Sequence, residues 1–163
     1  MDYMPWQALV FQSIPEGIIL VSLGLGLMGV LPPFRKVVVI GTVISLLSFF
    51  LRRLPVIFGV HTLLYILLLA LLLKIGLRDM EWWRSIAAGL LPTIILGLVE
   101  GVSTPLMLRL TGMDLTRVLH DPWLRVFFPL PNEILLGVLA YLIWRYRLSL
   151  LSGKGEVSSR EEQ

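Results

Sequence analysis

Long apolar runs separated by short charged segments constrain this chain more than any other feature of its sequence. A helix that crosses a bilayer needs about 20 mostly apolar residues. Five runs approach or exceed that length, at about residues 8–31, 37–51, 56–73, 86–108 and 124–144. Of the 163 residues, 56% are apolar and 15% are charged, against about 45–50% and 25% in soluble domains. The sequence therefore predicts an all-α integral membrane protein with about five transmembrane helices in residues 1–147. The polar residues 148–163 are expected to form a disordered cytoplasmic tail.

The segment between the fourth and fifth runs has a different pattern. Leu115, Val118 and Leu119 would share one face of a helix, Asp114 could cap its start, and Pro122 would end it. A short helix with one apolar face favours the plane of the membrane surface. We therefore expect a short interfacial amphipathic helix between transmembrane helices 4 and 5.

Composition and motifs exclude several classes of function. The chain has no cysteine, which excludes disulfides, zinc thiolates and cysteine nucleophiles. It contains no HExxH, GxSxG or Walker motif. The net charge of +3 is small, and the basic residues flank apolar runs, which is typical of topology control rather than of nucleic-acid binding. We expect neither an enzyme nor a cofactor.

The distribution of Lys and Arg predicts the orientation, because cytoplasmic loops are enriched in both. With five spans, the side that holds the N-terminus has five basic residues: Arg52, Arg53, Arg109, Arg117 and Arg125. The opposite side has nine: Arg35, Lys36, Lys74, Arg78, Arg84, Arg145, Arg147, Lys154 and Arg160. We therefore expect a multi-pass protein of the cell membrane with its N-terminus outside and its C-terminus in the cytoplasm.

Four ionisable side chains lie inside the predicted spans. They are Glu16, His61, Glu100 and Glu133, and Asn132 precedes the last of them. At 1.5 Å of rise per residue, all four lie ~8–13 Å below the outer ends of their helices. A charge at mid-membrane costs ~2.5–3.5 kcal/mol on insertion scales, so these groups should face inward, pair, take up protons or line water. This shared depth predicts an outward-facing polar pocket that binds a small ligand, a peptide or a cation.

Basic residues and prolines surround the predicted pocket. Arg52, Arg53 and Arg109 stand at the outer rim, where they could form ion pairs or guard an entrance. Pro15 and Pro131 lack an amide hydrogen and should disturb the helices that they enter. Plain alternatives stay open. The acids near helix starts could be interface residues favoured by the helix dipole, the histidine could be a packing residue, and the cluster could hold the bundle together without a ligand.

Three segments resemble a known family. They read FQSIPEGIILVSLGLGLMG, FLRRLPVIFGVHT and LTGMDLTRVLHDPWLRVFFPLPNEILLGVLAYLIW, and the likeness extends over residues 11–147. Its motifs are Pro15-Glu16, Arg53-Leu54-Pro55, Phe58-Gly59, His61-Thr62 and Pro131 with Glu133. They resemble the membrane-spanning N-terminal region of Gram-positive sensor histidine kinases of the sporulation-phosphotransferase and accessory-gene-regulator type. The sequence departs from that family after Arg147, because residues 148–163 contain no phosphoacceptor segment and no ATP-binding domain.

The resemblance implies a sensor that reports an external or in-membrane signal to the cytoplasm. Its partners would be the lipid bilayer, a kinase or other signalling protein, and another copy of the chain. The second hypothesis is a small transport component that binds a substrate or a proton. The third is an intramembrane metalloenzyme with Glu and His ligands, whose metal the sequence does not identify. A structural scaffold without a ligand is the fourth.

Overall fold

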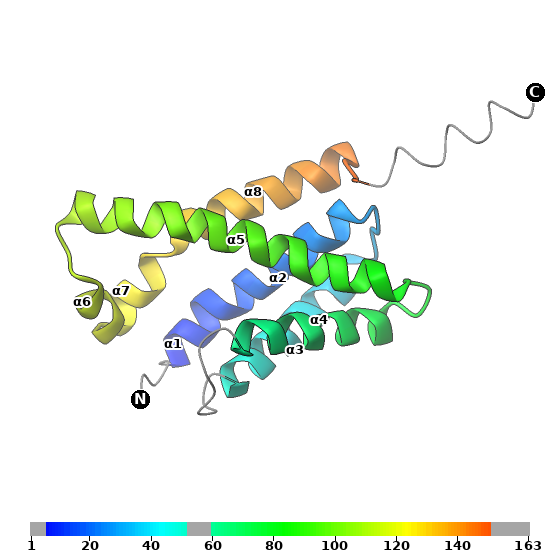
Figure 1. The fold of residues 1–163 in the computed structure, drawn as a ribbon, viewed down its shortest axis with the longest axis horizontal. Helices are drawn as coiled ribbons and strands as arrows, with labels where there is room; N and C mark the ends of the chain where they lie inside the picture. The colour runs from blue at the N-terminus through cyan, green and yellow to red at the C-terminus, as the bar shows by residue number, and fades with distance from the viewer. Residues whose placement is uncertain (1–5, 52–59, 151–163) are drawn as a thin grey trace, which may run out of the picture.

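The computed structural model describes residues 6–51 and 60–150, and within them every regular element is a helix (Figure 1). The chain begins with α1 (Trp6–Ala8), a π-helical segment η1 (Leu9–Ser13) and α2 (Ile14–Leu27). The later elements are α3 (Phe34–Leu51), α4 (Val60–Gly76), α5 (Trp82–Thr111), α6 (Leu115–His120), α7 (Pro122–Phe127) and α8 (Leu130–Tyr146). Helices α6 and α7 lie at the end of the molecule where α1 begins and α5 ends, and α8 ends at the opposite end (Figure 1).

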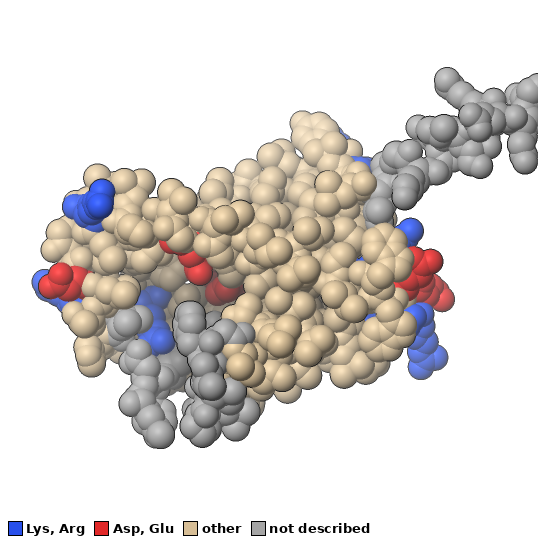
Figure 2. All heavy atoms as spheres, in the orientation of Figure 1, with Lys and Arg blue, Asp and Glu red and all other residues tan. Residues whose placement is uncertain are grey.

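Four helical stretches among the described residues are long and apolar enough to cross a membrane. They are Trp6–Leu27, Phe34–Leu51, Trp82–Thr111 and Pro122–Tyr146, and α4 is a shorter apolar helix of 17 residues. On the face shown in Figure 2, Lys, Arg, Asp and Glu gather mainly at the two ends of the molecule, and most of the surface between them is uncharged. The prediction of an all-α fold with several helices able to cross a membrane is confirmed at this level.

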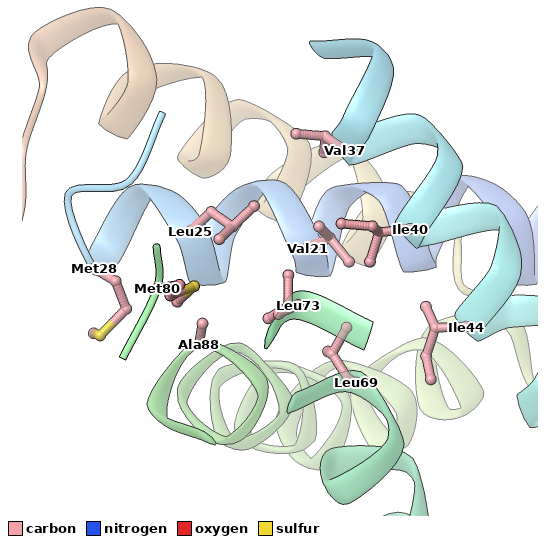
Figure 3. Packing of buried hydrophobic residues seen from close by; sticks show 10 residues of the cluster. All are labelled: Val21, Leu25, Met28, Val37, Ile40, Ile44, Leu69, Leu73, Met80 and Ala88. Atoms are coloured by element: carbon pink, nitrogen blue, oxygen red, sulfur yellow. The ribbon is translucent and has the colours of Figure 1, made fainter. Parts of the chain in front are cut away.

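Helix α2 is the centre of the bundle. Its Val21 and Leu25 are fully buried against α3, α4 and α5 in a cluster that also contains Met28 and Met80 (Figure 3). On another side, Leu20 and Leu23 pack against α8. Because α2 contacts three long helices, a displacement of α2 reaches most of the fold.

Small residues let the backbones of this bundle come close together. A side chain at Gly24 would overlap the backbone carbonyl of Ala88 in α5. Pro92 lies four residues after Ala88 in α5. It has no N–H, so it cannot donate the usual helical hydrogen bond to that carbonyl. A side chain at Gly17 would likewise overlap Ser45 and Gly41 of α3. Such close contacts between small residues are typical of helix packing in membranes.

The first helix ends earlier than predicted, at Leu27 rather than near residue 31. Gly29 has a positive φ of 70° and donates to the carbonyl of Gly26, and Val30 donates to Leu25, both at 2.9 Å. This pair of bonds is a Schellman motif, which satisfies the last carbonyls of a helix. The sequence interpretation was wrong here because it used the following prolines, and not Gly29, as the stop.

The last predicted span, residues 124–144, lies within the apolar stretch Pro122–Tyr146, which is interrupted between α7 and α8. α7 ends at Phe127 and α8 begins at Leu130. Pro129 and Pro131 flank that start, and neither can donate an amide hydrogen to a preceding turn. Other helix ends also differ from the predicted ones by a few residues. Helix α3 begins at Phe34 rather than near residue 37, and α5 extends over Trp82–Thr111 rather than residues 86–108. The predicted start of the third span, at residues 56–59, and most of the predicted tail lie outside the described residues.

The short helix predicted between spans 4 and 5 is present as α6, and it ends before Pro122 as expected. Asp114 occupies its N-cap position, but the carboxylate makes no capping hydrogen bond. Asp121 instead caps α7 and accepts from the amides of Trp123 and Leu124 at 2.8 and 3.2 Å. The predicted N-cap position of Asp114 is therefore confirmed, whereas the side-chain capping bond is made by Asp121 at the next helix.

Candidate functional site

A partly enclosed cavity of about 640 Å³ lies among η1, α2, α3, α4 and α5. It occupies the half of the bundle where α2 and α4 begin. Its polar lining residues are Gln12, Ser13, Glu16, Ser45, Ser48, His61, Thr62, Tyr65, Thr93 and Glu100. Figure 2 shows acidic side chains in a hollow between the two charged ends of the molecule.

Three of the ionisable residues identified from the sequence line this cavity. Glu16 comes from the first turn of α2, His61 from the first turn of α4, and Glu100 from the middle of α5. Their equal predicted depth therefore corresponds to a shared location. Whether they bind a ligand stays a prediction.

Glu133 lies close to this group but does not line the cavity. It is in the first turn of α8, only 6% exposed, and it interacts electrostatically with Glu16 and Glu100. It lines a separate shallow hollow of about 400 Å³ beside Ile19 and Gly137. Its Oε1 atom is buried without a hydrogen-bond partner in the described part of the chain. The neighbouring Asn132 is 7% exposed and lines neither hollow.

The predicted entrance arginines are placed differently or fall outside the described residues. Arg109 is exposed in the last turn of α5, nine residues beyond Glu100, which is about 13 Å along the helix. It is not among the cavity-lining residues, and its entrance role stays a prediction. Arg52 and Arg53 lie outside the described residues.

The sequence around Pro15 explains how the cavity acquires part of its polar wall. Pro15 has no N–H to donate to the preceding turn, and the helix directly before it is π-helical over Leu9–Ser13. The hydroxyl of Ser45 lies 2.6 Å from the carbonyl oxygen of Ser13 and 2.7 Å from that of Gly41, and can donate to either. This contact ties α3 to the π-helical segment. Such segments occur frequently at functional sites, and this one contributes Gln12 to the lining.

Two polar atoms of lining residues are buried without a partner in the described structure. They are Oε1 of Gln12 and Nδ1 of His61. Buried polar groups in folded proteins are nearly always hydrogen-bonded, so unpaired atoms beside a cavity mark a place where a bound molecule could complete the bonding. Within the described ranges, no three His, Cys, Asp or Glu residues are arranged to hold a metal ion.

Sequence reasoning missed much of the polar wall, namely Gln12, Ser45, Ser48, Tyr65 and Thr93. Some of them could have been found by asking which residues share a helix face with His61 or Glu100. Tyr65 follows His61 by four residues, and Thr93, Gly97 and Glu100 follow the i, i+4, i+7 pattern of one helix face.

The fold and the cavity together fit a class: multi-pass α-helical membrane proteins with a polar, partly enclosed cavity inside the bundle. No family model, curated protein or solved structure matches this chain.

Proposed function

We propose that this chain is a non-enzymatic sensor or accessory module of the cell membrane. It binds a small ligand, a peptide or a cation in the cavity and passes a shift of α2 to α8 and the tail, where a signalling partner responds. The observation that carries this proposal is the meeting of Glu16, His61 and Glu100 from three helices at one cavity.

The proposed topology has five spans, with the N-terminus outside and the C-terminus in the cytoplasm. The fifth crossing is α4, whose 17 residues measure about 25 Å, close to the hydrocarbon thickness. The cavity then opens to the outside. Helix α6 lies at the outer membrane surface, and the exposed rings of Trp6, Trp123 and Phe127 near the outer ends of their spans match the preference of aromatic side chains for that interface.

Direct contacts between α2 and α8 support signalling from the cavity to the tail. The indole Nε1 of Trp144 donates to the carbonyl of Ser22 at 2.7 Å. The amide of Leu150 donates to the carbonyl of Leu27 at 2.9 Å. Glu16 lies at the opposite end of the same α2 helix, so a rigid shift of α2 at the cavity would be felt at the end of α8. The resemblance to sensor histidine kinase membrane regions also supports this role.

A fluorescent reporter at the end of α8 tests this coupling without knowledge of the ligand. Because the chain has no cysteine, Ser149→Cys can be labelled uniquely with bimane in the full chain. We expect Glu16→Gln to shift the emission of the reporter, and Glu81→Gln, an exposed carboxylate before α5, to leave it unchanged. If Glu16→Gln changes the melting temperature but leaves the emission of the reporter unchanged, the scaffold hypothesis is favoured.

Transport is the second candidate, because Glu133 of α8 interacts with two carboxylates that line the cavity. Carboxylates in series can bind and release a proton or a cation. Proteoliposomes that contain a trapped pH dye separate the two functions. A sensor should dissipate an imposed pH gradient no faster than its Glu100→Gln variant, whereas flux that depends on Glu100 would establish transport.

A further inference from the structure

A second hollow lies at the end of the bundle where α2 and α4 end. Its volume is about 460 Å³, and it lies among the first turn of α3, the end of α4, the loop that follows α4 and the first turn of α5. Three cationic side chains line it, Lys36 from α3, Arg78 from the loop and Arg84 from α5. Basic side chains gather at this end of the molecule (Figure 2). We term this site the basic hollow.

Cations outnumber anions around the basic hollow. Among the lining residues that the structure describes, Asp79 is the only acid. Glu81, which follows in the same loop, forms an ion pair with Arg84, with 3.6 Å between Oε2 and Nε. Three cations therefore face two carboxylates. The ammonium group of Lys74 adds a further positive charge close by, because it donates to the carbonyl of Met80, another lining residue, at 2.6 Å. The local charge favours an anion.

The lining cations keep hydrogen-bond donors for a ligand. The Lys36 ammonium has three donors, and one of them makes a long hydrogen bond of 3.4 Å to the carbonyl of Gly76. Arg78 makes no side-chain hydrogen bond or ion pair in the part of the chain that the structure describes. Nε of Arg84 has no hydrogen-bond partner there either. Phosphate oxygens accept strong, charge-assisted hydrogen bonds from such groups.

The position of the basic hollow indicates where such an anion comes from. Ile75, in the last turn of α4, is 63% exposed and lines the hollow together with Leu77. The half-exposed rings of Trp82 and Trp83 follow at the start of α5, and tryptophan favours the interface between membrane and water. Lipid headgroups lie at that depth. A soluble anion would use the cations but would gain nothing from the apolar wall.

We propose that the basic hollow binds the phosphate group of an anionic phospholipid. Lys36, Arg78 and Arg84 hold the phosphate, and the exposed apolar residues contact the acyl chains. Basic pockets between transmembrane helices bind acidic headgroups in this way. Control of topology requires cations on one side of the membrane, but it does not require them to converge on one hollow. This site is separate from the polar cavity, and its test does not depend on the function proposed for that cavity.

Quenching by brominated lipids tests the site in the full chain. Because the chain has no cysteine, Ile75→Cys can be labelled uniquely with bimane. The protein is reconstituted in phosphatidylcholine that contains a small fraction of brominated lipid. We expect brominated phosphatidylglycerol to be enriched beside the reporter about fivefold over brominated phosphatidylcholine. A bimane at Val102→Cys, on a residue of α5 that is 73% exposed, should be quenched equally by both lipids.

Neutral variants separate a site from a general attraction of anionic lipids. Lys36→Gln and Arg78→Gln should each bring the preference for phosphatidylglycerol close to one. Arg145→Gln removes the same charge from an exposed position in the last turn of α8 and should leave the preference unchanged. Equal losses in all three variants would show diffuse attraction to the surface. That result, or the absence of any preference in the parent chain, would overturn the proposal.

Soluble phosphate distinguishes the two sources of the anion. We expect millimolar inorganic phosphate to leave the quenching by brominated phosphatidylglycerol unchanged, relative to chloride at the same ionic strength. If phosphate displaces the lipid from the parent chain, the basic hollow is a site for a water-soluble phosphate, and the assignment to a phospholipid is wrong.

Discussion

The two halves of the bundle are built differently, although the same long helices pass through both. In one half, which we term the packed half, Val21 and Leu25 of α2 are fully buried and Gly24 lies against the backbone of α5. In the other, the cavity half, the same α2 helix presents Glu16 to a cavity of about 640 Å³, beside Gln12 of the preceding segment. Packing density falls and polarity rises along a single helix.

This difference separates what stabilises the fold from what the fold can do. In the packed half, close helix contacts and buried apolar side chains give favourable dispersion. In the cavity half, buried polar atoms without partners cost free energy. The residues that line the cavity also lack the dispersion contacts that packed side chains would make. A bundle selected only for stability would be expected to fill that half with apolar side chains. The retained polar wall is consistent with the binding role proposed above, and each prediction below tests the division between the two halves.

The largest expected effect is on the packed half, from Gly24→Leu. A side chain there overlaps the carbonyl of Ala88, so α2 and α5 must separate. Overpacking costs about 1–3 kcal/mol, occasionally more, and we expect the upper end because the obstacle is backbone. The melting temperature in detergent, followed by circular dichroism, should fall strongly, with loss of a monodisperse species.

Gly101→Leu is the matched control for this change. Gly101 is also helical, and a Cβ there meets nothing within 4 Å. We expect its free energy of unfolding to change by less than about 0.5 kcal/mol. Equal effects at Gly24 and Gly101 would break the comparison, because helix packing would then not be concentrated in the packed half.

The next effect has the opposite sign and belongs to the cavity half. Glu133 is 6% exposed, its Oε1 has no partner in the described structure, and two other carboxylates repel it. Glu133→Gln keeps the shape and cannot ionise beside the two other carboxylates, so we expect a higher melting temperature. The exposed Glu81→Gln should change little. A lower melting temperature for Glu133→Gln would show that this carboxyl holds the bundle together.

Relative depth along each helix could be predicted from the sequence, and this explains why Glu16, His61 and Glu100, chosen by depth, line one cavity. A rise of 1.5 Å per residue converts position into depth once the ends of a span are known. Rotation about the helix axis could not be predicted, because apolar residues surround each span and leave no polar face to orient it. Glu133, for which the same depth was predicted, lines a different hollow, and Arg109 does not line the cavity.

Other features depended on contacts between helices that no single segment reveals. Ser45 and Ser48 of α3 were missed because hydroxyls are common in membrane helices, and only the packing of α3 against η1 gives these two a role. By contrast, the end of α2 near Gly29 and the interruption before α8 are encoded by local sequence signals. A closer reading of one glycine, and of Pro129 with Pro131, would have found them.

A smaller effect is expected where the packed half joins α8. Trp144→Phe removes the hydrogen bond to the carbonyl of Ser22, which should lower the free energy of unfolding by about 1 kcal/mol. Trp82→Phe, on a half-exposed ring, should have almost no effect on thermal melting. If Trp144→Phe also removes the response of the Ser149→Cys reporter to Glu16→Gln, the bond belongs to the coupling route. A retained response would confine its role to stability.

The smallest effect should come from the boundary between the two halves, at Ser45. Its hydroxyl, on a residue that is 2% exposed, reaches the Ser13 carbonyl across two helices. The hydroxyl of Ser22 donates within its own helix, to the carbonyl of Ile18. We expect Ser45→Ala to cost about 0.5–1 kcal/mol and Ser22→Ala less. Because Ser45 ties η1 to α3, its loss should also loosen the cavity wall. A cysteine introduced at the lining position Ser48 should then react faster with a methanethiosulfonate reagent, which Ser22→Ala should not cause. Equal labelling rates in both variants would mean that the π-helical segment keeps its position without Ser45, and that the boundary between packed and cavity halves is set by Pro15 alone.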